Sequence, residues 1–530
     1  MPAKQIDDSH WRPKHNAWII ALTVTLATFM EVLDTSIANV ALPHIAGGLG
    51  ASQNESTWVL TSYLVSNAII LPISAWLARS FGRKRFYMTC VALFTASSFL
   101  CGLAPSLGML IVFRVLQGAG GGGLAPSEQA ILADTFHPSM RGMAFAIYGM
   151  AVVVAPAIGP TLGGWITDNY SWRWIFYINI PVGLLSLLLT HRLVEDPPYL
   201  TNQREKSRHS KIDLTGLGLV AIAMGCLQMV LDKGQESDWF ASHWITALFI
   251  IAMVTLVVWI FWEWRHKDPI VDLHLFKHRN FAVAMLITFF LGVVLFSTTV
   301  VIPQFLQELL GYTAFAAGEA LAGGGLVMMV MMPISGFLVS RVDPRKMMAF
   351  GFLSTAAALY FITTHLTLQM DFKTAALLRT FQTVGLAFIF LPSNTLAYAD
   401  IPREKYNQVS SLNAFIRNIG GSIGIAVVTD LVTRQAQKHQ NYLVPQISNF
   451  NLQYRTMVNG ISNSLQNAGL NASDADRQAI GRISGMVHAQ ARTLSYIDVM
   501  SMLAVIIVCL TPLVLLMKYS RPPRGAEALH

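Results

Sequence analysis

The stretch "MAVVVAPAIGPTLGG" (150–164) is apolar enough to lie in a lipid bilayer, yet it carries Pro156, Gly159, Pro160, Gly163 and Gly164. Proline removes a backbone donor and clashes with the preceding turn, and glycine weakens a helix interior. No serine lies near the carbonyls that the prolines free. The segment is therefore expected to bend. The bend is either that of an ordinary kinked span, since both residues are common in membranes, or a feature that the function of the protein requires.

The rest of the chain has the composition of an integral membrane protein. Of its 530 residues, 53% are hydrophobic and only 12% are charged, whereas soluble proteins carry about a quarter charged residues. The net charge is +8, but the basic residues cluster in short loops between apolar runs, which indicates membrane topology and not nucleic-acid binding. The cysteines lie in or beside apolar runs without a CxxC pair, so neither a disulfide framework nor a metal site is expected.

Apolar runs long enough to span a membrane need about 20 residues. Fourteen candidates meet this length: 17–43, 57–78, 86–104, 107–133, 142–166, 172–191, 213–232, 244–264, 280–306, 316–340, 347–366, 374–399, 410–433 and 498–517. With the N-terminus in the cytoplasm, every second loop is rich in Lys and Arg, as in "RSFGRKR" (79–85) and "RVDPRK" (341–346). Both termini are therefore predicted to be cytoplasmic, because basic residues mark cytoplasmic loops.

Two segments of the chain repeat each other. "AWLARSFGRK" (75–84) is similar to "GFLVSRVDPRK" (336–346), and "RVLQG" (114–118) is similar to "RTFQTVG" (379–385). Such duplication is typical of transporters built from two related halves. The sequence predicts an all-α membrane protein with six-helix halves in 1–191 and 265–530, joined by a linker and two extra spans in 192–264.

Four motifs in order carry a family resemblance: "LDTSIANVALPHIA" (33–46), "GRKR" (82–85), "RVLQGAGGGGLAPSEQ" (114–129) and "GMAVVVAPAIGPTLGG" (149–164). With them the chain resembles the fourteen-span drug:proton antiporters of the major facilitator superfamily, and is similar to the EmrB-type multidrug efflux pumps of the Gram-negative inner membrane. The resemblance implies proton-driven export of hydrophobic drugs or toxic compounds, with the proton gradient in place of any cofactor. It implies a periplasmic adaptor and an outer-membrane channel as partners. The GxxxG pair Gly159 and Gly163 lets another helix approach closely, and the fold that the resemblance implies predicts a span of the other half as its partner, across the seam that opens and closes.

Three alternatives to a general drug exporter stay open. A narrower exporter of fatty or aromatic acids is compatible with the same motifs. A proton-coupled importer is less favoured, because the resemblance links the proline-glycine motif to antiport. A membrane enzyme or receptor is not favoured, since we find no phosphate-binding loop and no metal-ligand pair in the sequence.

Four charged residues inside spans are predicted to couple proton movement. Glu31 and Asp34 lie three residues apart and share a helix face, and a carboxylate in hydrocarbon normally faces a cavity or a partner. Arg114 is the natural partner, because Asp34 and Arg114 lie roughly 13 and 10 Å from the outer ends of their spans. Glu128 lies about 21 Å beyond Arg114 and is predicted to line an inward-facing cavity or relay protons, or else to cap the helix.

Further site residues are predicted in a loop and around a central cavity. The resemblance assigns a cytoplasmic gate to Gly82, Arg83 and Lys84, but Arg79 stands where the family has an acidic residue, so topology-setting charge is an equal interpretation. The predicted lining of the cavity is Gln117, Glu319, Arg417, Phe29, Trp58 and Tyr63.

The last outer loop (434–497) is much longer than the others. Apolar residues recur at helical spacing between Phe450 and Leu465, and again between Ile480 and Leu494. This pattern predicts two amphipathic helices outside the membrane, which either dock the adaptor or lie on the bilayer.

Overall fold

The computed structural model describes residues 13–200, 213–266, 269–448 and 450–518, and every regular element within them is helical. The α-helices are α1 (Ala17–Leu49), α2 (Gln53–Ser56), α3 (Trp58–Phe81), α4 (Arg83–Leu103), α5 (Leu107–Gly121), α6 (Leu124–Thr135), α7 (Arg141–Asn169), α8 (Trp174–Tyr177), α9 (Asn179–Leu193), α11 (Leu214–Lys233), α12 (His243–Arg265), α13 (Arg279–Glu308), α14 (Ala314–Val339), α15 (Pro344–His365), α16 (Phe372–Ala397), α17 (Tyr406–Leu443), α18 (Leu452–Asn467) and α19 (Ala472–Leu510). The 3₁₀ helices are η2 (Gln235–Ser237), η3 (Trp239–Ala241), η4 (Leu273–Lys277), η5 (Arg403–Lys405), η6 (Val444–Gln446) and η7 (Thr511–Leu516). Residues 1–12 before the first span, residues 201–212 of the predicted linker and residues 519–530 after the last span lie outside the described residues.

Fourteen helical segments of the described residues are long and apolar enough to cross a membrane, which confirms the predicted number. The last two predicted spans, 410–433 and 498–517, are shorter than the helices that contain them. The first of these helices continues beyond 433, and the second begins before 498. α17 runs to Leu443 and α19 starts at Ala472. A helix needs no break where it leaves the bilayer, so a limit drawn from hydropathy marks the apolar part alone.

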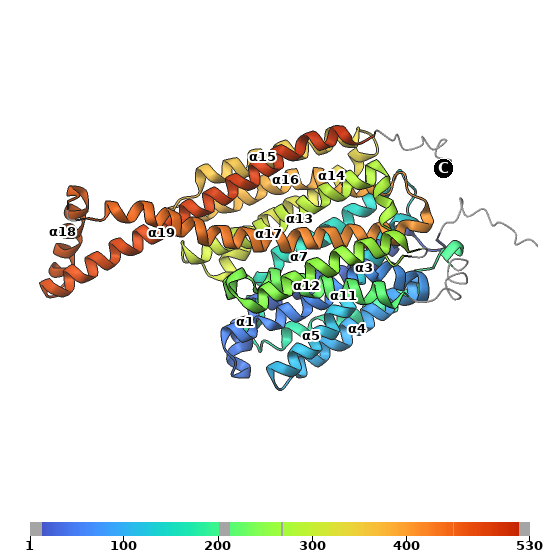
Figure 1. The fold of residues 1–530 in the computed structure, drawn as a ribbon, viewed down its shortest axis with the longest axis horizontal. Coiled ribbons are helices and arrows are strands. Elements are labelled where there is room, and N and C mark those ends of the chain that lie inside the picture. Colours follow the sequence, from blue (N-terminus) through green and yellow to red (C-terminus); the bar gives the residue numbers. More distant parts are fainter. Residues whose placement is uncertain (1–12, 201–212, 267–268, 449, 519–530) are drawn as a thin grey trace, which may run out of the picture.

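The helices form one bundle with an extension at one end (Figure 1). We call the end at which α1 begins and η7 ends the terminal side, and the opposite end the distal side; the charge pattern predicts that the terminal side is cytoplasmic. α7 packs along α14, and α3 packs along α17, so these two pairs join the predicted halves. α11 packs against both α3 and α17, while α12 presents a largely exposed apolar face. The predicted domain limits stay a prediction.

The extension consists of the end of α17, η6, α18 and the first part of α19, and it projects from the distal side beyond the other helices (Figure 1). The two predicted amphipathic helices are present, but the second is continuous with the last span. Leu465 of α18 and Ile483 of α19 are buried where these helices pack together. Phe450 and Leu452 are exposed, so packing within the extension buries only some of its apolar side chains.

Candidate functional site

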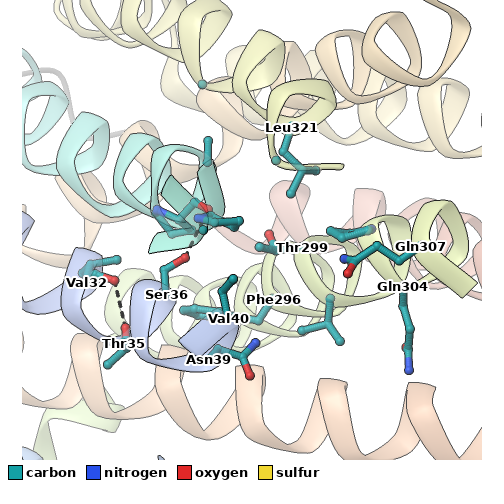
Figure 2. A pocket seen from close by; sticks show the side chains of 18 of the residues that line it. Val32, Thr35, Ser36, Asn39, Val40, Phe296, Thr299, Gln304, Gln307 and Leu321 are labelled. Carbon is teal, nitrogen blue, oxygen red and sulfur yellow. Dashed lines mark hydrogen bonds between the residues drawn. The ribbon is translucent and has the colours of Figure 1, made fainter. Parts of the chain in front are cut away.

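A cavity of ≈ 990 Å³ lies between the two halves. Its walls come from α1, α3, α7, α13, α14, α16 and α17. Figure 2 shows α1 contributing Ser36 and Asn39 to one wall, and α13 contributing Thr299 and Gln304 to another. The lining reaches His44 at the distal end of α1. The cavity therefore extends toward the distal side.

The halves are held together on the terminal side by direct contacts. Asn413 of α17 donates to Gln129 of α6 at 2.8 Å, and Ser411 donates to the Leu71 carbonyl of α3 at 2.7 Å. The Arg141 guanidinium lies 4.9 Å from the centre of the Tyr406 ring, within the range of a cation–π contact. These contacts close the terminal half of the path, so the structure has the arrangement of an outward-facing state if the predicted topology holds.

Asp34 and Arg114 form a buried ion pair, as the matching depths predicted. Arg114 Nη1 lies 2.6 Å from Asp34 Oδ2, and both side chains are almost fully excluded from solvent. Gln117 joins them, since it accepts from Arg114 at 2.7 Å and donates to Asp34 at 3.0 Å. Buried charges of this kind need a partner and further hydrogen bonds, and this network supplies both.

Tyr63 separates this ion pair from the cavity. Its ring centre lies 4.4 Å from the Arg114 guanidinium, and it is itself part of the cavity wall. Its hydroxyl donates to Glu31 at 3.3 Å, and Asn67 donates to the same carboxylate at 3.0 Å. Glu31 therefore faces α3 and does not share Arg114 with Asp34, although one helix carries both acids.

The sequence did not predict one hydrogen-bond donor to Asp34. Asn179, at the start of α9, donates to Asp34 Oδ1 at 2.6 Å, and its amide also lies 3.3 Å from the hydroxyl of Ser98 on α4. An asparagine at the beginning of an apolar span is a signal that was available, because intramembrane amides usually have a polar partner. The sequence could not reveal which partner it would meet.

The proline-glycine motif of α7 has two faces. Pro156, Pro160 and Gly164 line the cavity, whereas Gly159 and Gly163 meet Ser36 and Ile37 of α1. The prediction that this glycine pair packs against the other half is therefore wrong. The reason is angular: positions 159 and 163 lie on a different side of the helix from 156 and 160, and that side faces α1 of the same half.

The carbonyl of Pro156 also finds a partner. Ser36 Oγ of α1 donates to it at 3.3 Å, although the α7 sequence itself offers no serine there. α7 continues as one helix through both prolines. Rescue of a freed carbonyl by a neighbouring helix is common in membranes.

Small residues on α14 make the contact between the halves. Gly318 lies against Pro160 and Thr161, Gly325 against Ala157, and Gly336 against the backbone of α7 at residues 142–143. Close approach of two helices depends on such small side chains. The seam predicted for α7 therefore exists, but the other half supplies most of the glycines.

The predicted gate loop contains a buried ion pair. Arg83 Nη1 lies 2.7 Å from Asp134 Oδ2 of α6 and 3.4 Å from Asn407 of α17, in the other half. Burial raises the pKa of the Tyr199 phenol, which stays protonated and donates to Asp134 at 2.5 Å. Asp134 thus provides the acid that position 79 lacks, and the contacts of Arg83 go beyond setting topology.

The two other predicted gate residues shape this loop. Gly82 has φ +90°, a backbone conformation that favours glycine. Lys84 donates from its backbone to Asp196 at 2.9 Å, and from Nζ to the His191 carbonyl at 2.7 Å. The loop is therefore tied to the segment that follows α9.

Glu128 and Arg417 are buried in the terminal half of the bundle and do not line the cavity. Glu128 accepts a hydrogen bond from Thr25 of α1. The Arg417 guanidinium lies 5.5 Å from the centre of the Tyr148 ring. The prediction that Arg417 lines the cavity is wrong for this arrangement of the halves, because the contacts on the terminal side enclose it.

Of the other predicted lining residues, all of which the structure describes, Tyr63 alone is confirmed. Gln117 is buried in the ion-pair network instead. Glu319 is exposed on α14, because the cavity face of that helix follows Gly318 and Leu321. Phe29 packs against an apolar cluster of its own half. The centre of the Trp58 ring lies 5.3 Å from the Lys233 ammonium. Position within a span does not define direction around the helix axis.

Comparison with known proteins agrees with the predicted family and fold. Residues 24–425 match the family model described as Major Facilitator Superfamily. The multidrug export protein EmrB of Escherichia coli (strain K12) is 37% identical over 517 residues, which cover 97% of this chain and 98% of the relative. The fatty acid resistance protein FarB of Neisseria gonorrhoeae is 37% identical over 502 residues, covering 95% and 96%. The solved structure of the proton:xylose symporter XylE has a TM-score of 0.56 at 15% identity, covering 82% of this chain and 91% of that one, and supports the fold alone.

Proposed function

Because this chain belongs to the major facilitator superfamily, we propose that it works as a proton-driven antiporter in which Asp34 and Arg114 form the coupling site. It is a drug efflux transporter and a multi-pass protein of the inner membrane. The observation that carries the proposal is the buried Asp34–Arg114 pair, separated from the cavity by Tyr63.

The chemistry follows from the hydrogen bonds of Asp34. Oδ2 accepts from Arg114, while Oδ1 accepts from Gln117 and Asn179. A proton on this carboxylate removes its charge and occupies one acceptor position, so the attraction to Arg114 falls and one donor must turn away. Arg114 then keeps neutral partners alone, which are Gln117, the Val59 carbonyl and the Tyr63 ring, and any movement of that ring changes the cavity wall. Proton binding and substrate binding are thereby coupled through one side chain.

Transport in inverted membrane vesicles tests this assignment. With a pH gradient imposed, addition of a hydrophobic drug from a panel should release protons in the wild type, and Asp34→Asn should abolish the release. Glu319→Gln removes an exposed carboxylate of another span and should behave as the wild type. Drug exchange without a gradient should persist in Asp34→Asn, which shows that the variant is folded. Full gradient-driven transport by Asp34→Asn would refute the coupling site.

The extension supports a second part of the proposal, a tripartite pump with a periplasmic adaptor and an outer-membrane channel. It stands on the side toward which the cavity opens and projects away from the bundle (Figure 1), which favours docking over an orientation flat on the bilayer. Its exposed apolar residues, such as Phe450 and Leu452, offer a contact surface. Replacing residues 444–480 by a short linker should abolish co-purification of the adaptor while membrane insertion persists; unchanged co-purification would contradict docking.

A narrower exporter of fatty or aromatic acids stays as the alternative. One relative, which matches over 96% of its own length, carries the name fatty acid resistance protein. A proton-coupled importer is less favoured, since the two relatives compared above are named an export protein and a resistance protein. Comparing drugs and fatty acids in the same vesicle assay separates the two exporters.

A further inference from the structure

Both halves of the protein contain the same arginine–glutamine pair. Arg379 donates from Nη1 to Gln382 at 2.8 Å, just as Arg114 donates to Gln117 at 2.7 Å. Arg379 and Gln382 each follow their counterparts by 265 residues. The duplication detected in the sequence therefore extends to the side-chain geometry.

The two pairs differ in the residue that they hold. In the first half, Arg114 and Gln117 both donate to Asp34. In the second half, Arg379 and Gln382 both donate to Thr298, at 2.8 and 2.9 Å. Thr298 lies 264 residues after Asp34 and takes its place, so a neutral hydroxyl stands where the first half has a carboxylate.

Arg379 is consequently a buried cation without an anionic partner. Its side-chain contacts are the hydroxyls of Thr298 and Thr299 and the amide of Gln382. No carboxylate of the described residues forms an ion pair with it, and the residue is only 6% exposed. A buried charge with neutral partners alone is costly, so an added anion has a large favourable interaction to gain here.

The position of Arg379 makes an added anion possible. Arg379 lines the cavity, whereas Arg114 does not. Thr299 of α13 and Leu321 of α14 line the same cavity (Figure 2). Gly324 faces Arg379, and a Cβ there would come within 2.9 Å of its Cγ. The glycine thus lets the aliphatic part of the arginine pack closely against α14.

The acids of the cavity do not serve this arginine. Glu308 forms an ion pair with Arg492 at 2.8 Å, and Asp168 lies 3.7 Å from His44. Both acids belong to the distal ends of their helices, away from Arg379 in the interior of α16. The wall between contains apolar residues such as Leu295, Phe296 and Val300. The site therefore has one positive charge in the interior of the cavity and apolar side chains between that charge and the distal end.

We propose that Arg379 binds the carboxylate of an amphiphilic monoanion, a molecule with one negative head and an apolar tail. The substrate thereby supplies to Arg379 the charge that Asp34 supplies to Arg114. The volume of ≈ 990 Å³ suffices for such a molecule. The inference rests on the proposed export function for its physiological meaning, but the binding site itself does not depend on proton coupling.

Equilibrium binding to the purified full-length protein tests the site without a pH gradient. The probes are radiolabelled decanoate and its neutral isostere decanamide, at a pH where decanoate is ionised. A charge-assisted contact is worth enough to give at least a tenfold preference for decanoate in the wild type. Equal affinity for the two probes in the wild type would overturn the proposal without any variant being made.

Two variants remove the site in opposite ways. Arg379→Gln deletes the cation, and Thr298→Asp keeps it but gives it an internal partner, as in the first half. Both should reduce the preference for decanoate to near unity, while Arg379→Lys retains part of it. Arg434→Gln, which removes an exposed arginine of α17 outside the cavity, should keep the wild-type ratio. Preserved preference in folded Arg379→Gln, judged by its gel-filtration profile, would refute the assignment.

The outcomes also separate this inference from the antiport proposal. Decanoate preference with no effect of Asp34→Asn on gradient-driven transport would support the anion site and refute the coupling site. Coupled transport with no preference between the probes would support the coupling site and refute the anion site.

Discussion

Three neighbouring glycines of α7 differ in the space around them, and a series of alanine substitutions should separate their roles. A Cβ at Gly159 would lie 2.5 Å from Ser36 Cβ, closer than packed atoms allow. At Gly163 the nearest atoms would be those of Ile37, at 3.1–3.3 Å, which is tight but adjustable. At Gly164 nothing lies within 4 Å.

The magnitudes follow from two opposing effects. Alanine in place of glycine stabilises a helix interior by about 0.5–1 kcal/mol, and overpacking by one carbon costs about 1–3 kcal/mol. Gly164→Ala should therefore stabilise slightly, Gly163→Ala should be close to neutral, and Gly159→Ala should lose about 0.5–2 kcal/mol. The effect at Gly159 should reach transport, because Ser36 lies two residues after Asp34 on the same helix.

Apparent melting temperatures of the purified proteins rank the stability of the three variants, and the vesicle assay measures their transport activity. We expect Gly164→Ala at or above the wild type, Gly163→Ala near it, and Gly159→Ala lowest in both measurements, with normal insertion. Ser36→Gly combined with Gly159→Ala should recover part of the loss, since it removes the atoms that clash. Equal behaviour of the three single variants, or no recovery in the double variant, would refute the packing argument.

Three other predictions concern the ion pairs. Asp134→Ala should destabilise the protein by about 3–5 kcal/mol, seen as a lower apparent melting temperature, because it leaves Arg83 buried without its carboxylate. Asn179→Ala removes one donor to the coupling carboxylate, and should shift the pH dependence of drug-induced proton release without abolishing it; an unchanged profile would exclude a positioning role. Burial acts to raise the pKa of Asp272, but the hydrogen bond and charge of Lys405, together with smaller contributions from His274, outweigh it, so that pKa is lowered. The stability lost in Lys405→Met at neutral pH should therefore diminish as the pH falls below about 4, the ordinary aspartate pKa, and a pH-independent difference in unfolding would contradict this.

The pairing of Asp34 with Arg114 was predictable because it depends on distance along two helices. The rise of 1.5 Å per residue gives each charge a depth, and two opposite charges at one depth in a bundle have a strong reason to meet. The partner of Arg83 was not predictable in this way. The loop has Arg79 where an acid was expected, and Asp134 lies on a helix whose orientation toward that loop depends on the packing of the whole half.

The sequence by itself determined the number of spans, the helical class, the duplication and the depth of each buried charge. These properties depend on the length of apolar runs and on spacing along the chain. Only the tertiary structure decided that Gly159 faces α1, that Glu319 is exposed, that Asn179 joins Asp34, and that Thr298 leaves Arg379 unpaired in the cavity. The physical reason is that rotation of a membrane helix about its axis is set by its neighbours, through contacts between segments that lie far apart in the chain.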